Sequence, residues 1–110
     1  MSGSVNSVFL IGNLGGDPEV KYLQGGMVVC EFSVATNRHW TDKRTSEKKS
    51  EVEWHNIVVY GDLAEAVGQH KRKGDSVSVQ GRLKTSSWED KETSKKMYKT
   101  AIIASSVGFL

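Results

Sequence analysis

The sequence predicts a small, mainly β domain, and three observations support this prediction. Apolar and polar residues alternate along most of the chain, and this period of two residues is typical of a strand and not of a helix. Glycine-rich turns separate these stretches, and one stretch alone, from Asp62 to Lys73, has the spacing of a helix. The chain has 110 residues, which is the length of one domain. We therefore expect residues 1–110 to fold as one unit.

Composition excludes several classes of protein. Hydrophobic residues make up 37% and charged residues 25%, so the chain is not a disordered polymer. The longest apolar run, Val8 to Ile11, is far shorter than the ~20 residues that span a bilayer. A basic, apolar leader is missing, and the single Cys30 cannot form an internal disulfide or a zinc site. We expect a cytoplasmic protein without a membrane partner.

Turn signals divide the chain into five main strands. A short extended piece, 19–22, lies between the first two, and residues 38–51 form a mobile β-ribbon or a loop. A second charged loop follows the fourth strand. The expected strands are Val5–Asn13, Met27–Asn37, Val52–Tyr60, Ser76–Trp88 and Met97–Leu110. Alternation places these residues on the inner side: Val28, Cys30, Phe32, Val34, Val77, Val79 and Leu83.

The one helix is expected between the third and fourth strands. Asp62 would cap its beginning, Lys71-Arg72-Lys73 would lie in its last turn, and Gly74 would end it. Five short strands, long hairpins after the second and fourth, and a helix at this position are typical of the OB-fold barrel. A five-stranded sheet of another topology is the alternative.

Positive charge is concentrated in two segments. The whole chain has 15 basic and 13 acidic residues. Residues 38–49 carry five basic and two acidic side chains, and residues 82–99 carry six basic and three acidic ones. Both segments contain predicted loops, and a solvated surface is the ordinary explanation for such a charge run.

Tryptophans lie in or beside these basic segments. Trp40 and Trp88 are surrounded by polar and charged residues, where a core tryptophan would be out of place. Period-2 spacing puts Trp54 on one face with Tyr60, and it puts His55 on the other. The parity of Trp88 also carries Arg82 and Lys84, provided that no bulge intervenes.

Flat aromatic rings next to cations suit single-stranded nucleic acid, because every base has a face that can stack and cations follow the phosphates. Ordinary barrel packing of the aromatic rings is the alternative.

The chain shows no sign of catalysis. Gly12 to Gly16 lacks the spacing of a phosphate-binding loop and is better explained as a turn. His39, His55 and His70 belong to three different elements without a second ligand at metal spacing. A nucleophile elbow is also missing. We expect no enzyme, no metal and no cofactor.

Several motifs, taken in order, resemble the bacterial-type single-stranded DNA-binding proteins, a homotetrameric OB-fold family. The motifs cover nearly the whole chain: Val5-Asn6, Gly12-Asn13-Leu14-Gly15, Asp17-Pro18-Glu19, Phe32-Ser33-Val34-Ala35-Thr36-Asn37, Glu53-Trp54-His55, Tyr60-Gly61, Leu63-Ala64-Glu65, Lys73-Gly74 and Gly81-Arg82-Leu83.

The resemblance implies a site and an assembly. Trp40, Trp54, Tyr60 and Trp88 would stack on bases, and His55 would lie at a subunit contact of a tetramer built from two dimers. The cations that would contact phosphates are Lys43, Lys49, Lys73, Lys84 and Arg82. Single-stranded DNA would be wrapped and protected during replication, recombination and repair.

The chain also departs from the family pattern. Ser86, Ser87 and Asp62 replace residues that are commonly basic. Family members continue into a flexible linker and an acidic tail that recruits replication and repair proteins, whereas residues 1–110 contain neither. We therefore expect either a trimmed DNA-binding core or a naturally short form, without recruitment of these partners through a tail. Two further hypotheses remain open at this point: a dimeric module that bridges replication proteins, and an RNA-specific or enzymatic OB domain.

Overall fold

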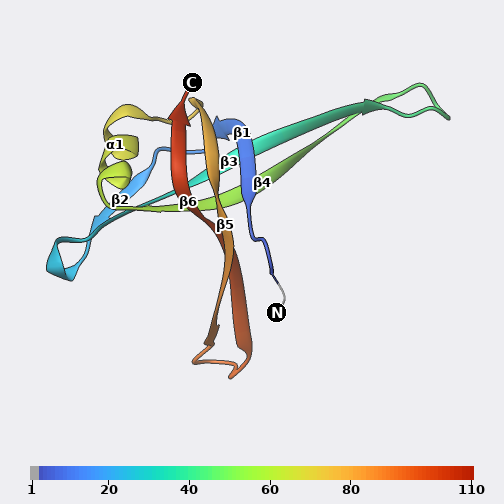
Figure 1. Ribbon diagram of the computed structural model, residues 1–110. Coiled ribbons are helices and arrows are strands. Elements are labelled where there is room, and N and C mark those ends of the chain that lie inside the picture. The colour runs from blue at the N-terminus through green and yellow to red at the C-terminus, as the bar shows by residue number, and fades with distance from the viewer. Residues whose placement is uncertain (1–2) are drawn as a thin grey trace.

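The computed structural model describes residues 3–110, which form a β-barrel with one helix (Figure 1). The sheet order is β1-β5-β6-β4-β3-β2, and β1 also pairs with β3, so five of the six strands close into a barrel. The sixth strand, β2, is the short expected piece that pairs with β3 alone. This arrangement confirms the OB fold. The elements are β1 (Val8–Leu14), β2 (Glu19–Tyr22), a 3-10 turn (Gln24–Gly26), β3 (Val28–Thr41), β4 (Lys48–Tyr60), α1 (Asp62–His70), β5 (Ser76–Glu89) and β6 (Lys96–Phe109).

Six of the seven residues that alternation placed inward lie in the buried core of the barrel. Branched side chains dominate it, because they pack well on a pleated surface. Cys30 has no exposed surface and serves as a small core residue, as expected. The buried cluster consists of Leu14, Val28, Cys30, Phe32, Val34, Ile57, Val59, Ala64, Val67, Val77, Val79 and Ile102.

Leu83 is the exception among the inward predictions. It keeps the parity of Val79 and lies opposite the buried Ile102, yet it is 49% exposed. The reason is that β1 pairs with β5 only as far as Gly81, so the barrel does not extend over Leu83. The register shift in this hairpin adds one residue, Ser105, to β6 opposite Gln80 and Gly81, and it leaves the parity of β5 unchanged.

The first strand begins three residues later than the expected Val5. Before Val8, the side chain of Asn6 takes over the pairing with β5. Its Nδ2 donates to the Leu83 carbonyl and its Oδ1 accepts from the Leu83 N–H, both at 2.8 Å. A side-chain amide thus replaces one step of the backbone ladder.

The helix ends earlier than expected. Gly61 is its N-cap, with φ of 76°, and no side chain makes a capping hydrogen bond, so the prediction that Asp62 caps the helix was wrong. Asp62 instead adds negative charge to the first turn, where it interacts favourably with the positive end of the helix dipole. Lys71 is already extended, and its N–H donates to the Val67 carbonyl at 2.9 Å. The predicted last turn, Lys71 to Lys73, is therefore a connection to β5.

Two long hairpins project from the barrel (Figure 1). β3 and β4 stay paired from Val29↔Tyr60 out to Thr41↔Lys48, which confirms a ribbon over most of residues 38–51. An ion pair of 3.2 Å between Arg38 and Glu51 lies along it. β5 and β6 stay paired out to Glu89↔Lys96. Both ribbons therefore present two solvent-facing sides beyond the barrel.

Candidate nucleic-acid interface

The side of β4 that faces away from the core carries two large exposed rings. Trp54 is 59% exposed and Tyr60 is 47% exposed, whereas Ile57 and Val59 between them are buried. The period-2 prediction for this strand is therefore confirmed. We call the surface that these two rings share with neighbouring side chains of β6 and β5 the outer face.

Gly15 sets the position of the Trp54 ring. The ring lies so close to the Gly15 backbone that a Cβ at residue 15 would overlap it, and that Cβ would also approach Ser33 Oγ to 2.8 Å. The Gly15 N–H donates to the Ser33 carbonyl at 3.0 Å, which ties the turn after β1 to β3. The glycine-rich turn thus supplies a flat support for an exposed indole.

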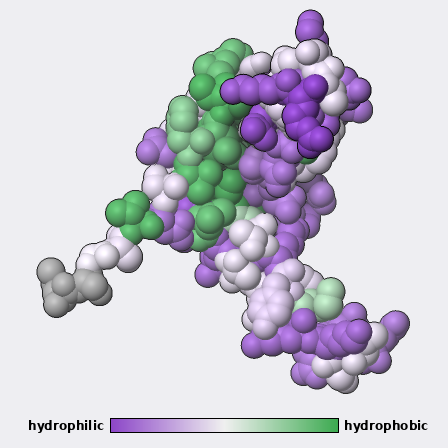
Figure 2. Space-filling view, turned by 90° about the vertical axis from the view of Figure 1, so that its right-hand side faces the viewer, coloured by the Kyte–Doolittle hydropathy of each residue, from purple (hydrophilic) through white to green (hydrophobic). Residues whose placement is uncertain are grey.

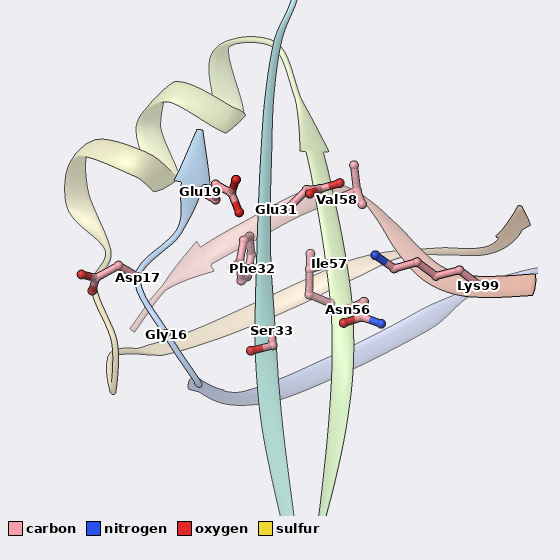
Figure 3. Close-up of a pocket in the computed structure, with 10 residues that line it drawn as sticks. All are labelled: Gly16, Asp17, Glu19, Glu31, Phe32, Ser33, Asn56, Ile57, Val58 and Lys99. Atoms are coloured by element: carbon pink, nitrogen blue, oxygen red, sulfur yellow. The ribbon is translucent and has the colours of Figure 1, made fainter. Parts of the chain in front are cut away.

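A pocket of about 280 Å³ opens on the outer face between the positions of Trp54 and Tyr60. Figure 3 shows the carboxylates of Glu19 and Glu31 on one side of it and Lys99 reaching toward it from β6. Lys21 Nζ lies 3.7 Å from a carboxylate oxygen of each glutamate. The pocket therefore combines partly neutralised carboxylates with polar groups of Ser33 and Asn56.

A second pocket, of about 180 Å³, continues the outer face toward β5. Tyr60, Lys84, Ser86 and Lys99 line it together with Glu31. Lys99 borders both pockets, although it is not among the cations predicted to contact phosphates. The signal for it lay in the hairpin register, since Lys99 pairs with Ser86 and so shares a face with Lys84.

Trp88 extends the same face along the β5–β6 ribbon. It is 49% exposed and lies opposite Met97. Arg82 and Lys84 share its parity, because the register from Arg82 to Glu89 contains no shift. The outer face thus brings together three of the four predicted rings and two of the five predicted cations.

Trp40 lies on a different surface. The register places it opposite Lys49 and two residues from Arg38, on the side of the β3–β4 ribbon opposite to Trp54. The Arg38 guanidinium carbon lies 4.6 Å from the centre of the Trp40 ring, at cation–π distance. Lys49 Nζ is 3.4 Å from Asp42 Oδ2, and Lys43 lies in the turn at the end of the ribbon. Within one chain, Trp40 and Trp54 are therefore not on one platform.

The remaining predicted residues lie beside these surfaces. Lys73 is exposed in the connection between α1 and β5, where its N–H donates to Asp17 Oδ1 at 2.8 Å. Asp17 also lines the larger pocket of the outer face. His55 is half-buried on the side of β4 opposite to Trp54, and its Nε2 lies 2.9 Å from Thr36 Oγ1.

Groups suited to other chemistry are scarce. Residues 3–110 contain no cluster of three or more His, Cys, Asp or Glu side chains that could hold a metal ion. In the same range, no helix is long and apolar enough to cross a membrane. Burial, and then the neighbouring Glu31 charge, raise the pKa of the Cys30 thiol to about 11, so this cysteine is a poor nucleophile.

A comparison with protein families shows which family the chain belongs to. The profile described as "Single-strand binding protein family" matches residues 5–110. The chain belongs to this family. A solved structure described as "Plasmodium falciparum SSB complex with ssDNA" is similar to it over 100% of this chain and 98% of the other, at 40% sequence identity and a TM-score of 0.89. Membership of the single-strand binding protein family agrees with the resemblance stated from the sequence motifs.

Proposed function

We propose that this protein binds single-stranded DNA without sequence preference and without catalysis, and that it protects exposed strands during replication, recombination and repair. The observation that carries the proposal is the outer face, where Trp54, Tyr60 and Trp88 are half exposed beside Lys84 and Lys99. Membership of the single-strand binding protein family and the similarity to a protein in complex with single-stranded DNA support it.

In the proposed mechanism, bases stack on exposed rings while cations neutralise phosphates. Each stacked base contributes on the order of 1–3 kcal/mol, and any base can stack, so binding is tolerant of sequence. Trp54, Tyr60 and Trp88 serve one face, and Trp40 serves the far side of the β3–β4 ribbon. A strand that uses all four rings has to pass around this ribbon. The cations assigned to phosphates are Lys43, Lys49, Lys73, Lys84 and Arg82, with Lys99 added from the geometry.

The larger pocket of the outer face, which Glu19 and Glu31 line, also fits this mechanism. Glu19 and Glu31 repel phosphates, so the backbone of the strand follows the lysines at the rim of the pocket. Beside their ion pairs with Lys21, the two carboxylates still have oxygen lone pairs that accept hydrogen bonds from base edges, as does the Asn56 amide. The pocket therefore favours bases over the backbone at this point of the path.

We further propose that the chain works as a homotetramer. β1 lies on the side of the barrel seen in Figure 2, where apolar surface forms a continuous area next to hydrophilic ribbons. Phe9 is 63% exposed and Ile11 58% exposed on this strand. Within residues 3–110, β1 pairs with β3 only at Asn13 and Leu14, which leaves the edge from Val8 to Gly12 without a partner strand. An open edge with apolar side chains supports pairing with a second copy.

Tryptophan fluorescence tests the function directly. Addition of oligo-dT is expected to quench the emission strongly and saturably, because stacked bases contact the rings, whereas duplex DNA and oligo-U quench much less. Trp54→Ala is expected to weaken oligo-dT binding while the assembly keeps its mass. An absence of quenching at low salt would refute the proposal, and equal response to oligo-U would favour an RNA-binding role.

A further inference from the structure

The β5–β6 ribbon has a second side that the proposed function leaves unused. Trp88 and Met97 occupy the outer face of this ribbon, so the neighbouring cross-strand pairs, Ser87↔Tyr98 and Glu89↔Lys96, lie on the opposite side. Tyr98 is 64% exposed, more than any of the three tryptophans or Tyr60. The ribbon projects from the barrel (Figure 1), and most of the Tyr98 side chain is open to solvent.

A cation accompanies the Tyr98 ring. Lys96 Nζ lies 5.7 Å from the ring centre. Among residues 3–110, Lys96 forms no ion pair within 4.0 Å, although Glu89 lies opposite it in the ladder. The pair thus offers a flat ring and an available ammonium group at one point. Arg38 and Trp40 form the same combination on the β3–β4 ribbon.

The side that carries Tyr98 leads back toward Trp54. Thr85 and Thr100 follow Tyr98 on this side, and their hydroxyl groups form a hydrogen bond of 2.8 Å. Thr100 and Leu83 then line a pocket of about 240 Å³ together with Trp54 and His55. The side that carries Tyr98 therefore continues along the hairpin to a pocket that Trp54 also lines.

We propose that Tyr98 and Lys96 form an additional stacking site for single-stranded DNA, with a base on the Tyr98 ring and Lys96 near the adjacent phosphate. This inference rests on the proposed function and deepens it. Trp40 already requires the strand to reach the side of a ribbon that faces away from Trp54, and Tyr98 supplies the equivalent contact on the other ribbon. Single-stranded DNA then contacts both sides of each ribbon.

The test compares Tyr98→Ala with the matched control Tyr22→Ala in oligo-dT titrations followed by tryptophan fluorescence. Tyr22 is 73% exposed and lies on β2, which is not part of either ribbon. Loss of one weak stacking contact is expected to reduce affinity about fivefold to tenfold for Tyr98→Ala. Tyr98→Phe keeps the ring and is expected to bind like the wild type, as is Tyr22→Ala.

Sedimentation of the free proteins separates a base site from a contact between copies. The proposal expects the same mass for wild type and Tyr98→Ala. A lower mass for the variant would assign Tyr98 to a subunit contact and overturn the proposal, as would unchanged affinity of Tyr98→Ala. If the wild type binds oligo-dT and the variant equals it, only the Tyr98 site fails. If the wild type itself does not bind, the proposed function fails and this inference fails with it.

Discussion

The indole of Trp54 rests directly on the backbone of Gly15, with no room for a side chain between them. The turn after β1 therefore determines where the most exposed tryptophan of the outer face lies. A ring held against backbone loses little further freedom when a base stacks on its open side, which favours binding. Gly15 is thus a positioning residue, although it offers no functional group to DNA.

Gly15→Ala is expected to weaken oligo-dT binding by roughly 1 kcal/mol, the lower end of the cost of one stacked base, because the added Cβ displaces the ring. Fluorescence titration measures the affinity, and urea unfolding of the same variant measures stability. Gly3→Ala is the control, since a Cβ at Gly3 meets no atom within 4 Å and Gly3 lines neither pocket of the outer face. Equal affinities for the two variants would show that the position of Trp54 does not depend on Gly15.

The role of Gly15 illustrates where sequence reasoning succeeds and where it stops. Alternation alone predicted which side of β4 carries Trp54 and Tyr60, because a strand allows only two orientations and a core selects one. The OB barrel followed from the order of strands and one helix. The contact between Gly15 and Trp54 depends on how a turn crosses over a distant strand, and local pattern contains no information on that crossing.

The ribbons show the same limit. The charge counts identified residues 38–49 and 82–99 as basic, but only the register assigns each cation to a side. Lys99 was missed because its partner across the hairpin, Ser86, lies 13 positions away in sequence. Trp40 and Trp54 were both predicted to stack on bases, and only the register shows that they occupy opposite sides of their ribbon. Leu83 was predicted inward because it shares the parity of Val79. That prediction failed because parity gives no information on where the barrel ends.

Lys84→Ala and Lys99→Ala are each expected to reduce the salt dependence of binding. A cation that neutralises one phosphate of a single strand contributes about 0.7 to the slope of log affinity against log salt concentration. Titrations with oligo-dT at several salt concentrations measure this slope. Lys84→Arg keeps the charge and is the control, with a slope equal to that of the wild type. If both alanine variants have the same slope as the wild type, these lysines do not contact the phosphates.

His55→Lys is expected to shift the protein to smaller assemblies. His55 is half-buried beside Thr36, and a lysine would place a charge at the proposed subunit contact, where an unpaired buried charge costs several kcal/mol. Sedimentation velocity measures the mass. His39→Lys introduces the same residue at an exposed position of β3 and is expected to leave the mass unchanged. If both variants sediment like the wild type, His55 does not lie in the interface.

The buried Cys30 thiol is expected to make the domain less stable in alkaline solution. Burial, followed by the charge of Glu31, raises the pKa of this thiol from 9.0 to about 11 in the folded chain. Between these two values the unfolded chain releases the thiol proton and the folded chain retains it. The free energy of unfolding therefore falls as the pH rises, by up to about 1.4 kcal/mol per pH unit, and below the lower value the thiol has no such effect.

Urea unfolding of wild type and Cys30→Ala at about pH 8 and about pH 10.5 measures this effect. Lysines and tyrosines titrate in the same range, but they are common to both proteins, so the difference between the two losses isolates the thiol. The wild type is expected to lose more stability than the variant. Equal losses would mean that the Cys30 thiolate is tolerated in the folded barrel, contrary to its complete burial among Val34, Val59 and their neighbours.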